Sequence, residues 1–305
     1  MRHLRLSLAG LGLCACAGSP TPAAPHWTEC FGAEATELLL DGRPVLRTVH
    51  DHAKERQAAT FKVYTHLFGP AGEGPLTKGD TGGLFPHHKG VFVGWNRVRF
   101  RGKQHDFWHG KDGVAQVLVS RAPLATAATA TQVLTIRWQL ADGTPVLQET
   151  RRLEVARLAH GVTVLDVDST FTSEEQVVLD GDPHHAGCHV RLAQEVAEHE
   201  KDTALLLPES ARRTKPDDES ILEACPFAGA VVTIGGRRYA VAHFDGPANP
   251  RGGLCSVRRY GRIGAFTKAT LAPGQPLRLG WRVLLADLDL APELATAAGV
   301  AAHKR

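Results

Sequence analysis

Alternating apolar and polar positions run through most of the chain and predict β-strands rather than helices. Residues 134–140 carry apolar side chains at every even position, which is the pattern of a strand with one buried face. An Ala-Asp-Gly turn at residues 141–143 leads into a second run at residues 145–155, and a third follows at residues 162–171. Three such runs joined by short turns indicate an antiparallel meander.

The same pattern extends along the rest of the chain, where amphipathic helices are scarce. Further strands are predicted at residues 114–121, 231–244, 254–266 and 277–285, with Gly- or Pro-containing turns between them. Many strands separated by turns are typical of two packed antiparallel sheets. The predicted fold class is therefore all-β, a large antiparallel β-sandwich.

No shift in composition divides the chain, so we expect a single β-sandwich domain over residues 28–290. Residues 291–305 are predicted to be a C-terminal tail, in which several alanines favour one short helix. Residues 198–219 are rich in charge and contain two prolines, so they are expected to form a long surface loop.

The N-terminus has the pattern of an export signal. Two arginines precede an apolar run, so residues 1–17 are predicted to be a signal peptide. Leu-Cys-Ala-Cys at residues 13–16 resembles a bacterial lipobox with Cys16 as the lipidated residue, whereas Ala-Cys-Ala at residues 15–17 fits a cleavage site that releases an unanchored protein. Both routes predict an exported protein, either periplasmic or lipid-anchored to a bacterial membrane.

The segment after the signal is proline-rich, and residues 18–27 are predicted to be a stiff, solvated linker. Beyond the signal no apolar run approaches the roughly 18 residues that a membrane-spanning helix requires, so no transmembrane span is predicted.

The bulk composition is that of an ordinary globular protein. Of the 305 residues 43% are hydrophobic and 22% are charged, and the formal net charge is +3. So small a charge, without any nucleic-acid-binding motif, argues against a nucleic acid partner. Cys30, Cys188, Cys225 and Cys255 lie beyond the signal and either form one or two disulfides in an oxidising compartment or remain buried thiols.

The 16 histidines gather in short motifs. FPHHKG at residues 85–90 and DPHHAG at residues 182–187 share the pattern Pro-His-His-x-Gly, which is typical of a junction between loop and strand. Because neighbouring side chains of a strand face opposite ways, only one histidine of each pair is expected to face a pocket. We predict that His88 and His185 converge on one pocket, with His189 beside the second.

Imidazole side chains serve either as metal ligands or as proton carriers near neutral pH. In the first case a divalent metal ion would be bound by His88, His185 and His189, with Asp106 of the HDFWH motif as a further donor. In the second case no metal is needed, and His88 or His185 would accept or donate the proton with Glu149 as carboxylate partner.

Glu149 shares a strand face with Arg151, so the two either line a concave binding face or form a structural ion pair. Near the C-terminus lies a second set of Asn, Arg and Tyr residues. Together with the tryptophans, these are the residue types that bind sugars, because their donors form hydrogen bonds with hydroxyls and the aromatic rings pack against the apolar face of the sugar ring. The side chains predicted to contact substrate are His87, Trp95, Asp106, Trp108, Arg191, Asn249, Arg251, Arg259 and Tyr260.

Five segments together resemble a known bacterial family. HHKGVFVGW, HDFW, DPHHAGCHVR, FDGPANPR and RRYGRIGAF, in this order, resemble the proteins called "methane oxygenase PmoA" or PmoA-like, a domain of unknown function. The resemblance covers residues 36–285. It implies a β-sandwich of the galactose-mutarotase-like kind and an association with carbohydrate metabolism. The methane-oxidising activity in the family's name implies membrane-spanning helices, which the chain lacks.

The sequence thus predicts an exported acid–base enzyme that acts on a small carbohydrate or sugar derivative through a histidine-rich pocket. Two alternatives stay open. One is a metal-dependent sugar lyase or hydrolase, and the other is a carbohydrate-binding protein without catalytic activity.

Overall fold

The computed structural model describes residues 25–79, 82–125, 128–250 and 254–304. The predicted signal peptide, the lipidation site at Cys16 and the linker as far as residue 24 lie outside the described residues. Within them, no helix is long and apolar enough to cross a membrane.

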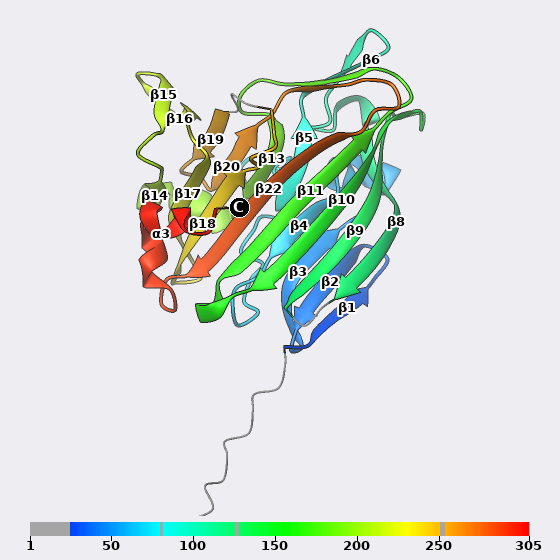
Figure 1. The fold of residues 1–305 in the computed structure, drawn as a ribbon. Helices are drawn as coiled ribbons and strands as arrows, with labels where there is room; N and C mark the ends of the chain where they lie inside the picture. The colour runs from blue at the N-terminus through cyan, green and yellow to red at the C-terminus, as the bar shows by residue number, and fades with distance from the viewer. Residues whose placement is uncertain (1–24, 80–81, 126–127, 251–253, 305) are drawn as a thin grey trace, which may run out of the picture.

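Two large antiparallel sheets pack face to face in the described part of the chain (Figure 1). The first sheet has the spatial order β1 (Trp27–Phe31), β2 (Ala35–Leu40), β3 (Arg43–Val49), β4 (Tyr64–Leu67), β5 (Val91–Trp95), β13 (Ala186–Arg191), β20 (Arg262–Phe266), β19 (Leu254–Arg258), β16 (Asp218–Glu223) and β15 (Arg212–Lys215). The second has the order β14 (Ala204–Leu206), β17 (Phe227–Ile234), β18 (Arg237–Asp245), β22 (Leu277–Asp287), β11 (Thr163–Thr172), β10 (Pro145–Arg157), β9 (Thr129–Gln139) and β8 (Ala115–Ala125). The predicted antiparallel β-sandwich is confirmed.

A small third sheet and short helical turns complete the fold. The sheet consists of β21 (Ala269–Leu271), β12 (Val177–Asp180), β6 (Arg97–Phe100) and β7 (Lys103–His105). The helical segments are η1 (Lys54–Arg56), α1 (Gln57–Thr60), η2 (Lys111–Gly113), η3 (Ala159–Gly161), α2 (Gln194–Glu198), η4 (Glu200–Asp202), η5 (Pro292–Ala295) and α3 (Ala297–Ala301).

Side chains from the facing sides of the two sheets form one core. Trp95 of β5 lies against Trp138 of β9 and Phe171 of β11, with its ring centroid 5.8 Å from each of theirs. All three rings are excluded from solvent, and Trp95 Nε1 donates to the carbonyl of Thr267 at 2.7 Å. Trp95, which the sequence assigned to substrate binding, is therefore a core residue.

An ion pair is buried within this core. Arg151 Nε donates to Glu149 Oε1 at 2.7 Å and Nη2 donates to Oε2 at 2.8 Å, and both side chains are enclosed. Trp138 Nε1 and Ser169 Oγ complete the hydrogen bonds of the carboxylate at 2.9 and 2.6 Å. Of the two interpretations of these residues, the structural pair is the one observed, and Glu149 does not face a binding surface.

Residues 198–219 are not the loop that their composition predicts. They contain η4, β14 and β15, and β16 begins at Asp218. Every residue of β15 is exposed, because this strand forms the edge of its sheet. An edge strand without a buried face lacks the alternation by which strands are recognised in a sequence.

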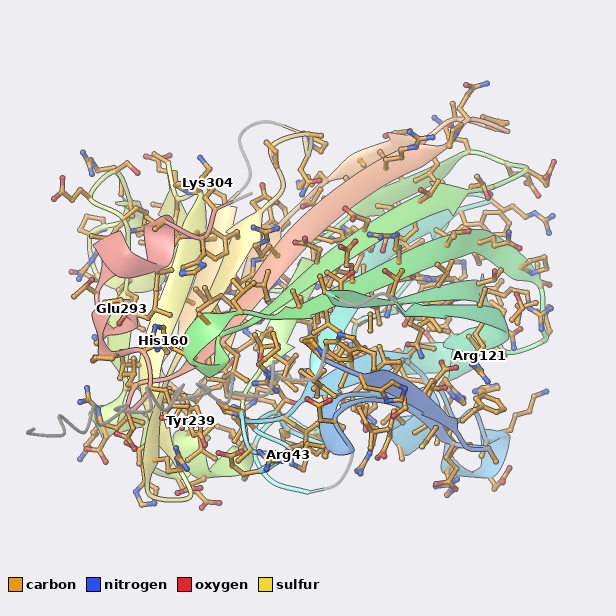
Figure 2. The ribbon with its side chains drawn as sticks, turned by 60° about the horizontal axis from the view of Figure 1, so that its bottom comes forward. Arg43, Arg121, His160, Tyr239, Glu293 and Lys304 are labelled. Atoms are coloured by element: carbon orange, nitrogen blue, oxygen red, sulfur yellow. The ribbon has the colours of Figure 1, made fainter. Side chains whose placement is uncertain are left out.

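The C-terminal segment is also better ordered than a tail. η5 and α3 pack Leu294 and Val300 against Phe244 on the outer face of the second sheet. Figure 1 shows α3 beside β14 and β18, and Figure 2 shows the same segment folded against the sheet, marked by Glu293 and Lys304.

Two further details concern the predicted linker and the predicted state of the cysteines. β1 begins at Trp27, inside the predicted linker, because the indole is buried in the main core. The four described cysteines are free thiols, with Cys30 exposed and the other three buried.

Replacement of Glu149 by Gln is expected to lower the free energy of unfolding by about 3–5 kcal/mol, because Arg151 would become an uncompensated charge in the core. Urea unfolding at pH 7 measures the change. Glu175→Gln is the matched control, since the ion pair of Glu175 with Arg101 is at the surface, where such pairs contribute little. A Glu149→Gln protein as stable as the parent would contradict the structural role of Glu149.

Candidate functional site

The chemically reactive side chains gather on the outer face of the first sheet, opposite the main core. β5, β13, β20 and β19 are neighbours in this sheet. On the outer face Phe92 of β5 lies directly opposite His189 of β13. The next row on this face holds Arg191, Arg262 and Arg258, one from each of β13, β20 and β19.

Loops close over this face and leave a cavity of about 420 Å³. It is lined by Phe85, His87, His88, His109, His184, His185, Arg258, Tyr260 and Arg262. Both Pro-His-His-x-Gly motifs and the HDFWH motif therefore contribute side chains to it. The structure brings His88 and His185 to one cavity, and their chemical roles stay predictions.

The second member of each histidine pair lines the same cavity, which strand alternation does not predict. His87 and His184 lie in turns rather than in strands, and β13 begins only at Ala186. Successive side chains of a turn are not held to opposite faces, so both histidines of each pair reach the cavity.

Of the other hollows on the described surface, two are similar in volume to the histidine cavity. One of about 430 Å³ is lined by residues of β10 and β11, contains no histidine, and its Arg101 and Glu175 pair with each other. Another, of about 480 Å³, shares His184 and His185 with the histidine cavity and extends to β15 and β16. The groups able to carry chemistry are therefore concentrated at the histidine cavity.

Two histidines of the cavity are each held by an aspartate three positions earlier. Asp106 Oδ2 lies 2.8 Å from His109 Nδ1, and Asp182 Oδ1 lies 2.7 Å from His185 Nδ1. Each aspartate also accepts a backbone N–H of its own turn at 2.9 Å, that of His109 in the first and that of His184 in the second. In these Asx turns the local backbone fixes carboxylate and imidazole as one unit.

These contacts determine which ring nitrogen is available. An ionised carboxylate only accepts hydrogen bonds, so Nδ1 carries the proton and the lone pair of the neutral ring is on Nε2. Among the described residues, Nε2 of neither His109 nor His185 has a hydrogen-bond partner, and the ring centroids are 5.1 Å apart. Two oriented imidazoles with free Nε2 atoms therefore line one cavity.

The surroundings hold these groups in states suited to proton transfer. Burial alone would raise the pKa of Asp106 and of Asp182, but the hydrogen bonds that they accept outweigh it and both pKa values are lowered. Burial lowers the pKa of His185 against the opposing effect of Asp182. At neutral pH His185 is therefore a neutral base beside an ionised aspartate.

His87 and His88 continue the row of imidazoles. The His87 ring lies 4.2 Å from that of His88 and 4.4 Å from that of His109, centroid to centroid. Burial, followed by the charge of Lys62, lowers the pKa of His87 to about 3. Burial also lowers the pKa of His88, and both of its ring nitrogens are buried without a partner among the described residues. Both rings are neutral, and both line the cavity.

Lys62 lies beneath this row, although nothing in the sequence marks it. Its Nζ donates to the carbonyls of His87 at 2.9 Å and of Trp108 at 2.8 Å, and it lies 4.1 Å from the centroid of the Phe92 ring. Burial, followed by the charge of Lys89, lowers the pKa of Lys62 well below its usual value. Lys62 thus joins the two histidine-bearing loops from below the cavity.

His184 is held by arginines. Arg258 Nη2 donates to His184 Nε2 at 2.8 Å, and His184 Nδ1 lies 3.1 Å from Ser256 Oγ. Arg262 donates to the carbonyl of His184 and, through Nη2, to Ser256 Oγ at 2.7 Å. Burial, followed by the charges of Arg258 and Arg262, lowers the pKa of His184 to about 4.

Several predicted contact residues lie behind the cavity wall rather than on it. The fully buried Trp108 packs edge-on against His88 at 5.8 Å, His185 at 5.4 Å and His189 at 4.7 Å between ring centroids. His189 is itself buried, with Nε2 3.1 Å from the carbonyl of Ala186. Trp108 and His189 therefore position the lining rings.

Arg191 and Asp106 likewise act through neighbours. The Arg191 guanidinium lies 5.0 Å from the Tyr260 ring centroid and donates to the Tyr260 carbonyl, which holds the β19–β20 turn over the cavity. Asp106 orients His109 and is not itself part of the lining.

Other predicted contact residues lie elsewhere. Asn249 Nδ2 donates to Asp245 Oδ1 at 2.6 Å and to the carbonyl of Gly280 at 2.8 Å, so Asn249 braces a turn. Arg259 Nε donates to Glu219 Oε1 at 2.8 Å, on the opposite side of the hairpin turn from Arg258. Arg251 lies outside the described residues.

The cavity does not fit a divalent metal. No group of three or more His, Cys, Asp or Glu side chains in the described segments is arranged to hold a metal ion. His189 is enclosed behind Trp108, and the guanidinium groups of Arg258 and Arg262 would repel a cation from the wall. The metal site predicted at His88, His185 and His189 is therefore not formed.

Sequence reasoning missed His109, Asp182, His184, Phe85, Arg258 and Arg262. A signal for the first two was present, because Asp-x-x-His occurs in both HDFWH and DPHH. The spacing of an aspartate three positions before a histidine is that of the two Asx turns observed. The arginines carried no such signal.

The fold and the cavity define a β-sandwich protein with a histidine- and arginine-lined site. Residues 35–299 match the family of unknown function DUF6807, and the chain belongs to this family. No curated protein matches the chain.

Solved structures with a similar course of the chain include aldose epimerases. A putative aldose 1-epimerase from Escherichia coli K12 is 10% identical, with a TM-score of 0.38, over 87% of this chain and 100% of that chain. The Slr1438 protein from Synechocystis sp. PCC 6803 is 10% identical, with a TM-score of 0.41, over 88% and 98%. A galactose 1-epimerase from Lactobacillus acidophilus NCFM is 11% identical, with a TM-score of 0.35, over 86% and 95%. Similarities this weak say nothing of what this chain binds.

Acidification from neutral pH is expected to destabilise the folded chain through two histidines of the cavity. The folded pKa values of about 3 for His87 and about 4 for His184 lie below the ordinary histidine value of about 6.5. From about pH 6.5 down to about pH 4 the unfolded chain binds protons at these positions and the folded chain does not, so the free energy of unfolding falls. Urea unfolding between pH 7.5 and 4.5 measures this slope. His184→Gln should reduce it, and an unchanged slope would contradict the lowered pKa of His184.

Proposed function

We propose that the chain is a carbohydrate-active enzyme that performs acid–base catalysis on a sugar or sugar derivative. The observation that carries this proposal is the presence of two Asp–His units, Asp106–His109 and Asp182–His185, with rings 5.1 Å apart on one cavity. An imidazole held in one orientation by a carboxylate is arranged for proton transfer. Two of them on one cavity can serve as acid and base towards the same substrate.

The proton balance of the proposed reaction is simple. Nε2 of neutral His185 accepts a proton from a substrate hydroxyl or acidic C–H bond, and the bonding electron pair stays on the substrate. The protonated form of His109 donates a proton from Nε2 to another substrate atom, so the net charge of the substrate is unchanged. Asp182 and Asp106 keep their Nδ1–H hydrogen bonds and stabilise each imidazolium. An isomerisation or an elimination fits this exchange.

The size and lining of the cavity support a ligand of sugar size. Its volume of about 420 Å³ is within the usual range of small-molecule sites. Phe85 and Tyr260, with ring centroids 4.9 Å apart, offer aromatic surface to the apolar face of a sugar ring. The resemblance to PmoA-like proteins implies carbohydrate metabolism as well.

Export remains part of this proposal. The predicted signal over residues 1–17, with lipidation at Cys16 or cleavage after Ala17, would direct the enzyme to the periplasm or to a bacterial membrane surface.

His185→Gln and Asp182→Asn are each expected to lower kcat by about 10²–10⁴, because the first removes the base and the second replaces the acceptor-only carboxylate with an amide that can also donate and so no longer fixes one tautomer. The measurement is NMR detection of turnover in a panel of neutral and acidic monosaccharides and disaccharides, with the parent protein as reference. His199→Gln is the matched control, since His199 is exposed and its ring makes no hydrogen bond with other described residues. It should retain the parent kcat.

Three outcomes would contradict the proposal. A His185→Gln protein with the parent kcat would exclude His185 as the base. Sugar binding without turnover of any panel member would indicate the carbohydrate-binding alternative. Loss of turnover on chelation, restored by a divalent ion, would indicate the metal-dependent alternative.

A further inference from the structure

Three arginines stand side by side on the floor and wall of the cavity. Arg191, Arg262 and Arg258 lie directly opposite one another on β13, β20 and β19, in one cross-strand row. Like charges at directly opposite positions of antiparallel strands are destabilising. A row of three such charges therefore needs compensation from elsewhere.

The hydrogen-bond partners of the three guanidinium groups within the described chain are neutral groups. Arg191 donates to the carbonyls of Tyr260 and Leu192, and Arg262 donates to the carbonyl of His184 and to Ser256 Oγ. Arg258 donates to the ring of His184, which is neutral. In these described contacts none of the three guanidiniums forms an ion pair with a carboxylate, whereas the adjacent Arg259 pairs with Glu219.

Burial makes this arrangement more costly. Arg191 and Arg262 are excluded from solvent, and the Nε atom of each is buried without a hydrogen-bond partner among the described residues. Burial lowers the pKa of both guanidiniums to about 10. Asp182 opposes the lowering for Arg262 without outweighing burial, and the hydrogen bonds of Asp106 and Asp182 go to histidines rather than to the arginines. A buried charge without an opposite partner is unfavourable until one is supplied.

We infer that Arg258 and Arg262 form a subsite for an oxyanion, so that the substrate is a sugar derivative carrying a carboxylate or a phosphate group. This inference rests on the proposed function and specifies its substrate class. Both arginines line the cavity, and a guanidinium presents paired N–H groups that match the two oxygens of a carboxylate or phosphate. Arg191 adds positive potential from behind the wall.

The position of the subsite relative to the acid–base groups supports the same substrate. His184 contacts Arg258 and Arg262, and the next residue is His185. Tyr260, between the two arginines in the chain, also lines the cavity. An anionic group held by the arginines would therefore place the adjoining sugar carbons beside His185.

The test compares acidic sugars with their neutral counterparts by isothermal titration calorimetry on the purified chain. The pairs are D-glucuronate with D-glucose, and D-galacturonate with D-galactose. D-glucose 6-phosphate and inorganic phosphate distinguish a phosphate from a carboxylate source. We expect at least one acidic sugar to bind about tenfold or more tightly than its neutral counterpart, with an affinity that falls as salt is added.

Arg258→Gln should remove this preference, and Arg258→Lys, which keeps the charge and loses the planar fork, should retain part of it. Arg259→Gln is the matched control. It removes the same charge from the next residue in the chain, whose side chain pairs with Glu219 instead of lining the cavity. It should leave the preference unchanged. Urea unfolding of each variant confirms that it is folded.

The inference is overturned if neutral sugars bind as tightly as acidic ones, if Arg258→Gln keeps the full preference, or if none of the anions, inorganic phosphate included, binds. Its failure is distinguishable from failure of the proposed function. Turnover of neutral sugars that depends on His185 would leave the acid–base function standing without the anion subsite. Acidic-sugar binding that depends on Arg258, with no turnover, would leave the subsite standing without the enzyme.

Discussion

Repulsion among the guanidinium groups of Arg191, Arg262 and Arg258 is the constraint on which the cavity depends. Their cross-strand row can exist only because acceptors are brought to it, and these come from the loops above the sheet. The carbonyls of Tyr260 and His184 both accept from the row. The arginines thereby hold the β19–β20 hairpin turn and the DPHH turn over the face, and the DPHH turn carries both His185 and the aspartate that orients it.

Burial, and after it the nearby positive charge, explains the state of three of the histidines. Both effects disfavour the imidazolium form, so the pKa values of His87, His184 and His185 are lowered. Asp182 opposes this effect for both His184 and His185, but does not outweigh it. Neutral rings are a requirement for accepting protons, and positive potential is a requirement for holding an anion. The arginine row supplies the positive potential. Burial, together with the arginines, keeps the rings neutral.

Much of the fold was predictable because it depends on local alternation. Residues 134–140 and their return strand repeat the apolar face that β9 and β10 bury. β15 was not predictable, because an edge strand that is exposed on both faces has no such pattern. In the site, His88 and His185 were predictable from their repeated motif. Sequence alternation could not show that His87 and His184 lie in turns. It also could not show that the side chain of Glu149 lies in the core between the two sheets rather than at the cavity. It also could not show which of two adjacent arginines, Arg258 or Arg259, faces the cavity.

The central claim is that a neutral imidazole, fixed by its aspartate, has a free Nε2 in a cavity built for an anion. Long-range ¹H–¹⁵N NMR of histidine-labelled protein at pH 7 tests it most directly, with His185 assigned by comparison with His185→Gln. We expect the His185 ring as the Nδ1–H tautomer with an unprotonated Nε2, and we expect D-glucuronate or phosphate to raise its pKa by supplying negative charge nearby. A His185 ring that is already an imidazolium at pH 7, or that is protonated on Nε2 instead, would contradict the account.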